Sequence, residues 1–207
     1  SHTDLTILGG GTLNVTGNYD DGISSKDGLV IVSGTVDVTA KDDGIRGKDY
    51  LVIKGGTIQV TSGGDSLKSD NEKDAGLGYV SVASGTLKLS SGDDGIDAWT
   101  AIAISGGTTT VAKSVEGLEA KNISLSGGKV TVTSSDDGIN ATDSASTVGD
   151  MEAQAGTMLS ISGGEVTITA DGDGIDSNGD VTMSGGTVRV NGPTANNNAA
   201  LDYNGTF

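Results

Sequence analysis

Aspartate and glutamate recur at regular intervals in this chain, and their carboxylates could bind metal ions. The motif Asp-Asp-Gly-Ile begins at Asp20, Asp42, Asp93 and Asp136, and degenerate copies lie between and after these. The acid two residues before the apolar residue of each copy recurs as Asp21, Asp43, Asp65, Asp94, Glu116, Asp137 and Asp173. With no Cys and a single His, the chain offers oxygen ligands rather than soft ones. Oxygen ligands predict a hard cation, and calcium, which takes six to eight oxygens in flexible geometry, fits best.

Two explanations of this acidic series stay open at this point. If the copies stack about 5 Å apart, each adjacent carboxylate pair costs roughly 3 kcal/mol at an effective dielectric near 20. Calcium between the copies would remove that cost. Alternatively, each Asp accepts backbone N–H bonds within its own turn and points to water. The candidate calcium ligands are Asp20, Asp21, Asp42, Asp43, Asp65, Asp93, Asp94, Asp97, Glu116, Glu119, Asp136, Asp137, Asp173 and Asp176. Near Asp65, the cations Lys68 and Arg46 could neutralise acids instead.

A repeat with a period of about 22 residues must position these carboxylates. Its marker is the last Gly of a Gly-Gly or Ser-Gly pair, at Gly11, Gly34, Gly56, Gly85, Gly107, Gly128, Gly164 and Gly186. These eight markers define repeats one to eight, and the intervals between successive markers are 23, 22, 29, 22, 21, 36 and 22. The two long intervals indicate insertions near residues 69–76 and 142–156, both at the same point of the repeat. Self-similarity at a fixed period of this length indicates a solenoid.

Apolar residues keep a constant phase within each repeat. In repeat two they are Leu29, Ile31, Val36, Val38 and Ile45. Spacing by two is the strand period, so each repeat carries two short strands and a third, shorter one at the Gly-Ile. One repeat cannot bury these residues alone, but stacked repeats can. The pattern predicts an all-β, right-handed, single-stranded parallel β-helix of about eight coils, with residues 1–207 as one domain.

Charge and composition exclude several partners. The formal net charge of −16 argues against nucleic acid and anionic membranes, whose phosphates would repel the chain. No apolar run approaches the roughly 18 residues of a membrane span, so membrane insertion is not expected. The same acidity favours cations, or a partner bridged through cations. A monomer is the expected state.

The repeat Asp-Asp-Gly-Ile, followed by a turn and then apolar-x-apolar-x-Gly-Gly-Thr, resembles a family of bacterial secreted carbohydrate-binding domains. Members are right-handed β-helices of the polysaccharide-lyase type that hold calcium. The resemblance runs from Leu5 to about Val190. It implies an extracellular or cell-surface location, bound calcium at the Asp positions that match, and binding of plant-cell-wall polysaccharide such as polygalacturonate or cellulose. It matches no sugar-contacting residue one by one.

Sugar contacts are therefore predicted from this sequence alone. The insertions flank repeats four and five, where the only Trp, Trp99, could stack on a pyranose face, with Lys121 and Lys68 nearby. Non-catalytic, calcium-dependent polysaccharide binding is the leading prediction. One alternative is a polysaccharide lyase that acts on uronates by calcium-assisted β-elimination, with a Lys or Arg as the base. The other is a passive surface scaffold or adhesin module.

Overall fold

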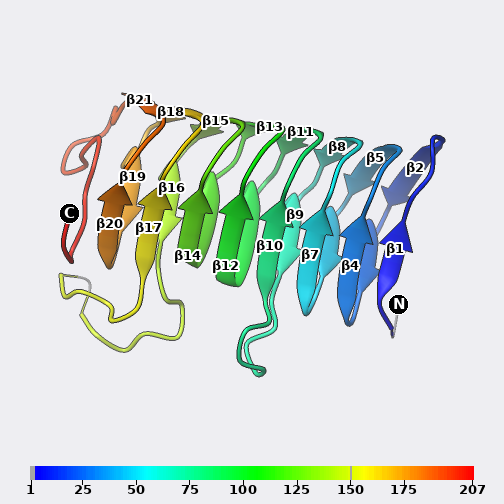
Figure 1. The fold of residues 1–207 in the computed structure, drawn as a ribbon, viewed down its shortest axis with the longest axis horizontal. Coiled ribbons are helices and arrows are strands. Elements are labelled where there is room, and N and C mark those ends of the chain that lie inside the picture. Colours follow the sequence, from blue (N-terminus) through cyan, green and yellow to red (C-terminus); the bar gives the residue numbers. More distant parts are fainter. Residues whose placement is uncertain (1–2, 150) are drawn as a thin grey trace.

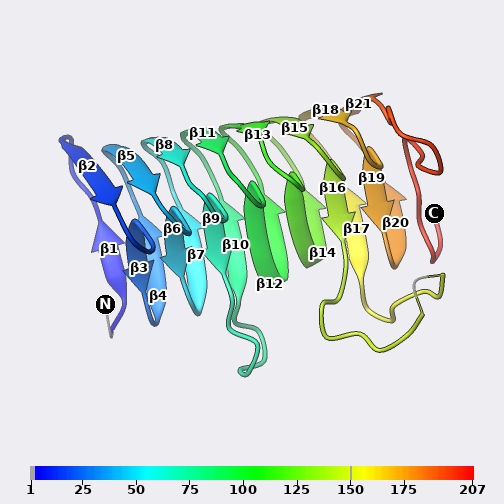
Figure 2. The same cartoon turned by 180° about the vertical axis from the view of Figure 1, so that it is seen from behind.

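The computed structural model describes residues 3–149 and 151–207. The described chain is all-β, and its strands pair only in parallel. Figures 1 and 2 show the strands stacked along one axis, with the two ends of the chain at opposite ends of the stack. Within the described residues, no helical segment has the length and hydropathy of a membrane span. This arrangement confirms the predicted all-β class and is consistent with a parallel β-helix.

Three lateral stacks of strands make up the molecule. The first contains β1 (Leu5–Ile7), β4 (Gly28–Ile31), β7 (Tyr50–Ile53), β10 (Tyr79–Val82), β17 (Met158–Ile161), β20 (Asp180–Met183) and the C-terminal parts of β12 (Ile96–Ile104) and β14 (Leu118–Leu125). The second is the eight-stranded sheet in the described chain: β2 (Thr12–Gly17), β5 (Thr35–Ala40), β8 (Thr57–Thr61), β11 (Thr86–Ser90), β13 (Thr108–Lys113), β15 (Lys129–Ser134), β18 (Glu165–Ala170) and β21 (Thr187–Asn191). The third contains β3 (Ile23–Ser25), β6 (Ile45–Gly47), β9 (Leu67–Ser69), β16 (Ile139–Ala141), β19 (Ile175–Ser177) and the N-terminal parts of β12 and β14.

The register of the strands reproduces the sequence period. Val36 pairs with Ile58 across β5 and β8, which is one regular period of the repeat. The longer steps fall where the sequence places its insertions. Ile58 pairs with Leu87 across the first insertion, and Val130 pairs with Val166 across the second. Equivalent residues of successive repeats are therefore neighbours in space, which is what brings distant carboxylates together.

The core consists of the apolar positions predicted from phase. Leu29, Ile31, Val38 and Ile45 of repeat two are 0% exposed, and Val36 is 1% exposed. Their equivalents in the other inner repeats are buried in the same way. Each residue covers the one above it, so the burial of every inner repeat depends on both neighbours.

The marker glycines allow the bends that keep this stacking tight. Gly56 has φ +99°, a conformation that other residues adopt only with strain. A Cβ built on Gly56 would lie 2.7 Å from the carbonyl oxygen of Gly34 in the repeat below. Any larger residue at this bend would therefore be strained and would clash with the repeat below.

Both insertions leave the stack at the same edge. The connections between β9 and β10 and between β16 and β17 hang from the lower edge in Figure 1, with β12 and β14 between them. In repeats four and five the third strand runs directly into the next first strand, which makes β12 and β14 long. Their register shifts between Ala98 and Ala101, so β12 bulges at Trp99. Asp150, inside the second insertion, lies outside the described residues.

Candidate cation and carbohydrate sites

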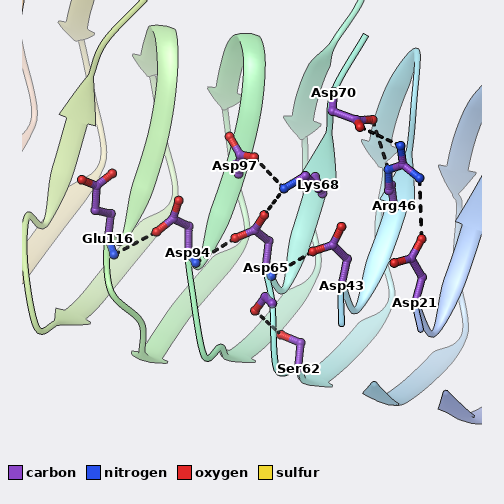
Figure 3. Close-up of polar contacts among 11 residues, drawn as sticks. Asp21, Asp43, Arg46, Ser62, Asp65, Lys68, Asp70, Asp94, Asp97 and Glu116 are labelled. Atoms are coloured by element: carbon purple, nitrogen blue, oxygen red, sulfur yellow. Dashed lines mark hydrogen bonds and ion pairs between the residues drawn. The ribbon is translucent and has the colours of Figure 1, made fainter. Parts of the chain in front are cut away.

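The acidic series forms a column in which carboxylates accept hydrogen bonds from the next repeat (Figure 3). The backbone N–H of Asp65 donates to Oδ1 of Asp43 (3.1 Å), and that of Asp94 donates to Oδ1 of Asp65 (2.8 Å). The N–H of Glu116 donates to Oδ1 of Asp94 (3.0 Å). We call this series, from Asp21 to Asp173, the acidic column.

Farther along the acidic column the same bond recurs. The N–H of Asp173 donates to Oδ1 of Asp137 (2.6 Å), and the N–H of Ala199 donates to Oδ1 of Asp173. The alternative of a bond within each residue's own turn is therefore wrong for these five carboxylates: their partner is the stacked repeat, because the register brings its amide within reach. One oxygen of each carboxylate is used in this way, and the negative charge remains to be balanced.

A second column stands beside the acidic one and decides how that charge is balanced. It consists of the residue directly after the apolar residue of the motif, and we call it the flanking column. Its members pair in register in the order Ser24, Arg46, Lys68, Asp97, Glu119, Asn140 and Asp176. The column is basic at repeats two and three and acidic or neutral from repeat four onward.

In the basic part, the chain supplies its own cations. The ammonium of Lys68 pairs with the carboxylates of Asp65 and, at 3.1 Å, Asp97. Because Asp65 is only 2% exposed, its charge depends on this partner. Burial alone would lower the pKa of Lys68, but the hydrogen bond and charge of Asp65 outweigh it and raise that pKa above its usual value.

Arg46 has the same role one repeat earlier. Its guanidinium donates two hydrogen bonds to Asp70 (3.1 and 2.6 Å) and lies 3.7 Å from Oδ2 of Asp21. The hydrogen bond to Asp70 raises the pKa of Arg46. The expectation that Arg46 and Lys68 lie close to these acids is confirmed.

In the acidic part, a carboxylate cluster forms no ion pair with any Lys or Arg of the described residues. Oxygen atoms of Asp94, Glu116 and Glu119 lie within 4.8 Å of one another. Burial, followed by neighbouring carboxylates, raises the pKa of Asp94 to about 8. Burial and the contact with Glu119 also raise the pKa of Glu116. The cluster thus gains a proton or a cation far more readily than ordinary surface carboxylates do.

Asn140 gives an independent sign that this cluster suits a cation. Its Nδ2 atom donates to Glu116 (3.1 and 3.2 Å) and to Glu119 (3.4 Å). The residue is only 8% exposed, and its buried Oδ1 atom has no hydrogen-bond partner among the described residues. An orphaned buried carbonyl costs about 1–3 kcal/mol. Turning the amide over would place that oxygen beside the Glu116 and Glu119 carboxylates, which adds a neutral oxygen to a donor set suited to calcium.

Three further carboxylate groups have oxygens within 4.8 Å of one another: Asp20, Asp21 and Asp42; Asp65, Asp93 and Asp94; and Asp173, Asp176 and Asp202. The second of these contains Asp65, which Lys68 already neutralises.

Asp137 and the exposed Asp136 both face Gly172 of the next repeat. A Cβ added to Gly172 would lie 2.6 Å from Oδ1 of Asp137 and 2.5 Å from Oδ1 of Asp136. Burial raises the pKa of Asp137 to about 6 and that of Asp176 to about 7.

The predicted sugar contacts do not share one set of neighbours. Trp99 is half-buried at the bulge, beside the first insertion, where its Cβ lies 3.0 Å from a Cβ built on Gly78. The ammonium of Lys121 pairs with Asp143 of the second insertion (2.8 Å). Lys68 is engaged by Asp65 and Asp97. Each lysine is thus held by a carboxylate, which disfavours either as the base of a lyase.

A polar pocket of about 370 Å³ opens beside the second insertion. It is lined by Thr142, Met151, Gln154, Asp173, Asp176, Asn178, Asp202 and Asn204. We call it the C-terminal pocket. Its acids belong to the Asp173, Asp176 and Asp202 cluster, so a hollow and a candidate cation site coincide here.

Sequence reasoning missed the residues that complete these sites. Asn140 occupies the flanking column, and its position directly after Ile139 is the signal that could have identified it. Asn178 directly follows β19 in repeat seven, where no acid or aromatic residue draws attention to it, and Asn204 lies in the C-terminal segment, which follows no repeat. Asp202 is in the Asp173 and Asp176 cluster, although its repeat is the least regular.

The fold and the acidic clusters together define a parallel β protein with oxygen-rich sites along one edge. Models of the family described as carbohydrate-binding domain-containing protein match residues 1–158 and 102–203. The chain belongs to this carbohydrate-binding domain family.

Comparisons beyond this family give weaker similarities. No curated protein matches the chain. Among solved structures, it is similar to one titled as the polysaccharide lyase-like protein from C. thermocellum, a gadolinium derivative. The two share 19% sequence identity, the match covers 93% of this chain and 86% of the other, and the TM-score is 0.38.

Proposed function

We propose that this domain binds plant-cell-wall polysaccharide without catalysis and that calcium held between repeats is needed for binding. The observation that carries the proposal is the Asp94, Glu116 and Glu119 cluster with the orphaned Asn140 carbonyl. These groups offer oxygen donors, and within residues 3–149 and 151–207 no Lys or Arg forms an ion pair with them, whereas Lys68 occupies the corresponding place in an earlier repeat. Membership of a carbohydrate-binding family supports the saccharide half of the proposal.

Calcium would have two roles here. It would replace the protons that the crowded carboxylates otherwise need, and so stiffen the stack. Where an ion is reachable from solvent, it would also present open coordination positions to sugar oxygens. This explains how a chain of net charge −16 binds an acidic or a neutral polymer without a basic surface.

The handedness, the ions and the location are part of the same proposal. The strand stacks are those of a right-handed β-helix with about eight coils, each with a period of about 22 residues. The ions are calcium at the clusters that include Asp94 and Asp173. The domain acts outside the cell or at its surface, as a monomer. The ion pairs of Lys68 and Lys121 favour binding over β-elimination, since neither amine is available to take a proton.

Retention on insoluble polysaccharide tests the proposal. The domain should be retained on cellulose or polygalacturonate in the presence of calcium and released by a chelator. Glu116→Gln with Glu119→Gln should weaken both calcium affinity and retention. Lys88→Gln, at an exposed position of β11, serves as the control and should behave as the parent. Retention that does not change when calcium is removed would refute the calcium requirement.

A further inference from the structure

The C-terminal pocket differs from the Asp94, Glu116 and Glu119 cluster in being open. At the Asp94, Glu116 and Glu119 cluster, the buried Asn140 donates hydrogen bonds to both glutamates. At the C-terminal pocket, Asp173, Asp176 and Asp202 face a hollow of about 370 Å³. A cation held by these three carboxylates would have protein on one side and space on the other. That is the arrangement of a site that takes a ligand rather than one that only stabilises the fold.

The neutral wall of the pocket suits hydroxyl groups. The Nδ2 atom of Asn204 donates to Oδ1 of Asn178 (3.1 Å), and Nδ2 of Asn178 donates to the hydroxyl of Thr142 (3.0 Å). This chain of bonds fixes a row of amides, which both donate and accept hydrogen bonds. Gln154 is anchored in turn, because its side-chain oxygen accepts the N–H of Asp143 (2.6 Å). The wall is therefore pre-organised.

Met151 adds an apolar contact. It lines the pocket and is 90% exposed, so core packing does not explain its position. A flexible thioether can pack on the C–H face of a sugar ring. One apolar group, several amides and an open cation position are the combination that a saccharide ring needs.

The charge of the lining selects the kind of saccharide. Among the described residues that line the pocket, none is Lys or Arg. Three carboxylates and one divalent cation leave a net charge of 2 − 3 = −1, which repels a uronate. We infer that the C-terminal pocket binds a neutral sugar unit, whose vicinal hydroxyls complete the coordination of the cation held by Asp173, Asp176 and Asp202. This inference rests on the proposed function, because it needs the cation.

Titration calorimetry with cellohexaose, mannohexaose and hexagalacturonate tests the inference on the whole domain in calcium. At least one neutral hexasaccharide should bind more tightly than hexagalacturonate. Asp202→Asn, at an exposed position, should weaken that binding at least about tenfold. Met151→Ala should weaken it about threefold to tenfold through lost apolar contact. Met158→Ala is the matched control, since Met158 is 44% exposed on β17 and does not line this pocket.

The outcomes separate this inference from the proposed function. If the parent binds calcium and polysaccharide while Asp202→Asn and Met151→Ala keep the parental affinity for neutral hexasaccharides, the pocket assignment is wrong and the proposed function stands. Tighter binding of hexagalacturonate, or no binding of either neutral hexasaccharide, also overturns the pocket assignment. If the parent binds no calcium, or binds sugars equally well after chelation, the proposed function fails.

Discussion

The charge of the acidic column is balanced differently in repeats two and three and in repeats five to seven. In the earlier repeats, Arg46 and Lys68 supply fixed positive charge to Asp21, Asp65 and Asp97. From repeat five onward, the flanking column holds Glu119, Asn140 and Asp176, and the carboxylates face one another. The backbone register is the same in both regions. The comparison shows that the residue in the flanking column decides how the charge is balanced. A lysine there supplies a positive charge, whereas a glutamate there adds a ligand for a bound cation.

The largest expected effect follows from removing the built-in cation. Lys68→Met should lower the free energy of unfolding by about 3–5 kcal/mol in chelator, because it leaves Asp65 buried without a counter-charge. Lys88→Met removes an exposed lysine of β11 and should change stability by less than about 0.5 kcal/mol. Denaturant unfolding measures both.

Calcium should then restore part of the stability of Lys68→Met, because the space left by the ammonium beside Asp65 and Asp97 resembles the carboxylate cluster at repeat five. If calcium does not reduce the loss of stability, the position of Lys68 in repeat three is not equivalent to the cation site proposed at repeat five.

The second effect is the response of the calcium-free protein to pH. The pKa of Asp94 in the folded protein is about 8 and that of Asp176 about 7, both raised by burial above the unfolded value near 4. Between these values the folded state keeps protons that the unfolded state releases, so stability falls as pH rises from about 4 to about 8. Each unit of pKa shift corresponds to about 1.4 kcal/mol, so the loss should exceed about 3 kcal/mol, measured by denaturant unfolding in chelator.

Calcium should flatten this pH profile, since it binds the ionised carboxylates. A calcium-free protein whose stability rises between pH 5 and pH 8 would show that the acidic region is neutralised in some other way.

A smaller effect is the stabilisation by calcium at fixed pH. At a free concentration of 100 times its Kd, one bound ion adds about 2.7 kcal/mol. Glu116→Gln should remove this gain for the ion at repeats four to six while leaving the Lys68 ion pairs intact. Thermal unfolding with and without calcium measures the difference. An unchanged calcium response in Glu116→Gln would place the ion elsewhere.

The smallest effect separates core packing from charge. Thr109 is fully buried in β13, and its hydroxyl has no hydrogen-bond partner. Thr109→Val should raise the free energy of unfolding by about 1 kcal/mol. The gain should be equal with and without calcium, because Thr109 lies in the core rather than at a carboxylate. A calcium-dependent gain would mean that the core and the cation sites are coupled.

The solenoid was predictable from the sequence because its causes are local and repeated. Phase alone identified Leu29, Ile31 and Ile45 as core, and each is fully buried. The glycine at each inner marker position has a backbone reason that recurs, as at Gly56. The acidic column was predictable for the same reason, since equal spacing along a repeat becomes vertical alignment.

The partners of the carboxylates were less predictable, because they depend on side-chain direction and on irregular segments. One interpretation of the sequence assigned the bonds of Asp43 and Asp65 to their own turns, whereas the structure assigns them to the next repeat. The C-terminal pocket needs Met151 and Asn204, which lie in segments outside the repeat. A repeat period predicts the residues that recur in every repeat, but it does not predict the contacts of irregular segments.

Anomalous diffraction from crystals grown in calcium would show whether cations bind between repeats, because it locates each ion relative to both columns. We expect an ion bound by Asp94, Glu116 and Glu119, with Oδ1 of Asn140 turned toward it, and none between Asp65 and Asp97, where Lys68 already lies. Ions beside Lys68 with none at Glu116, or no ion at either place, would contradict it.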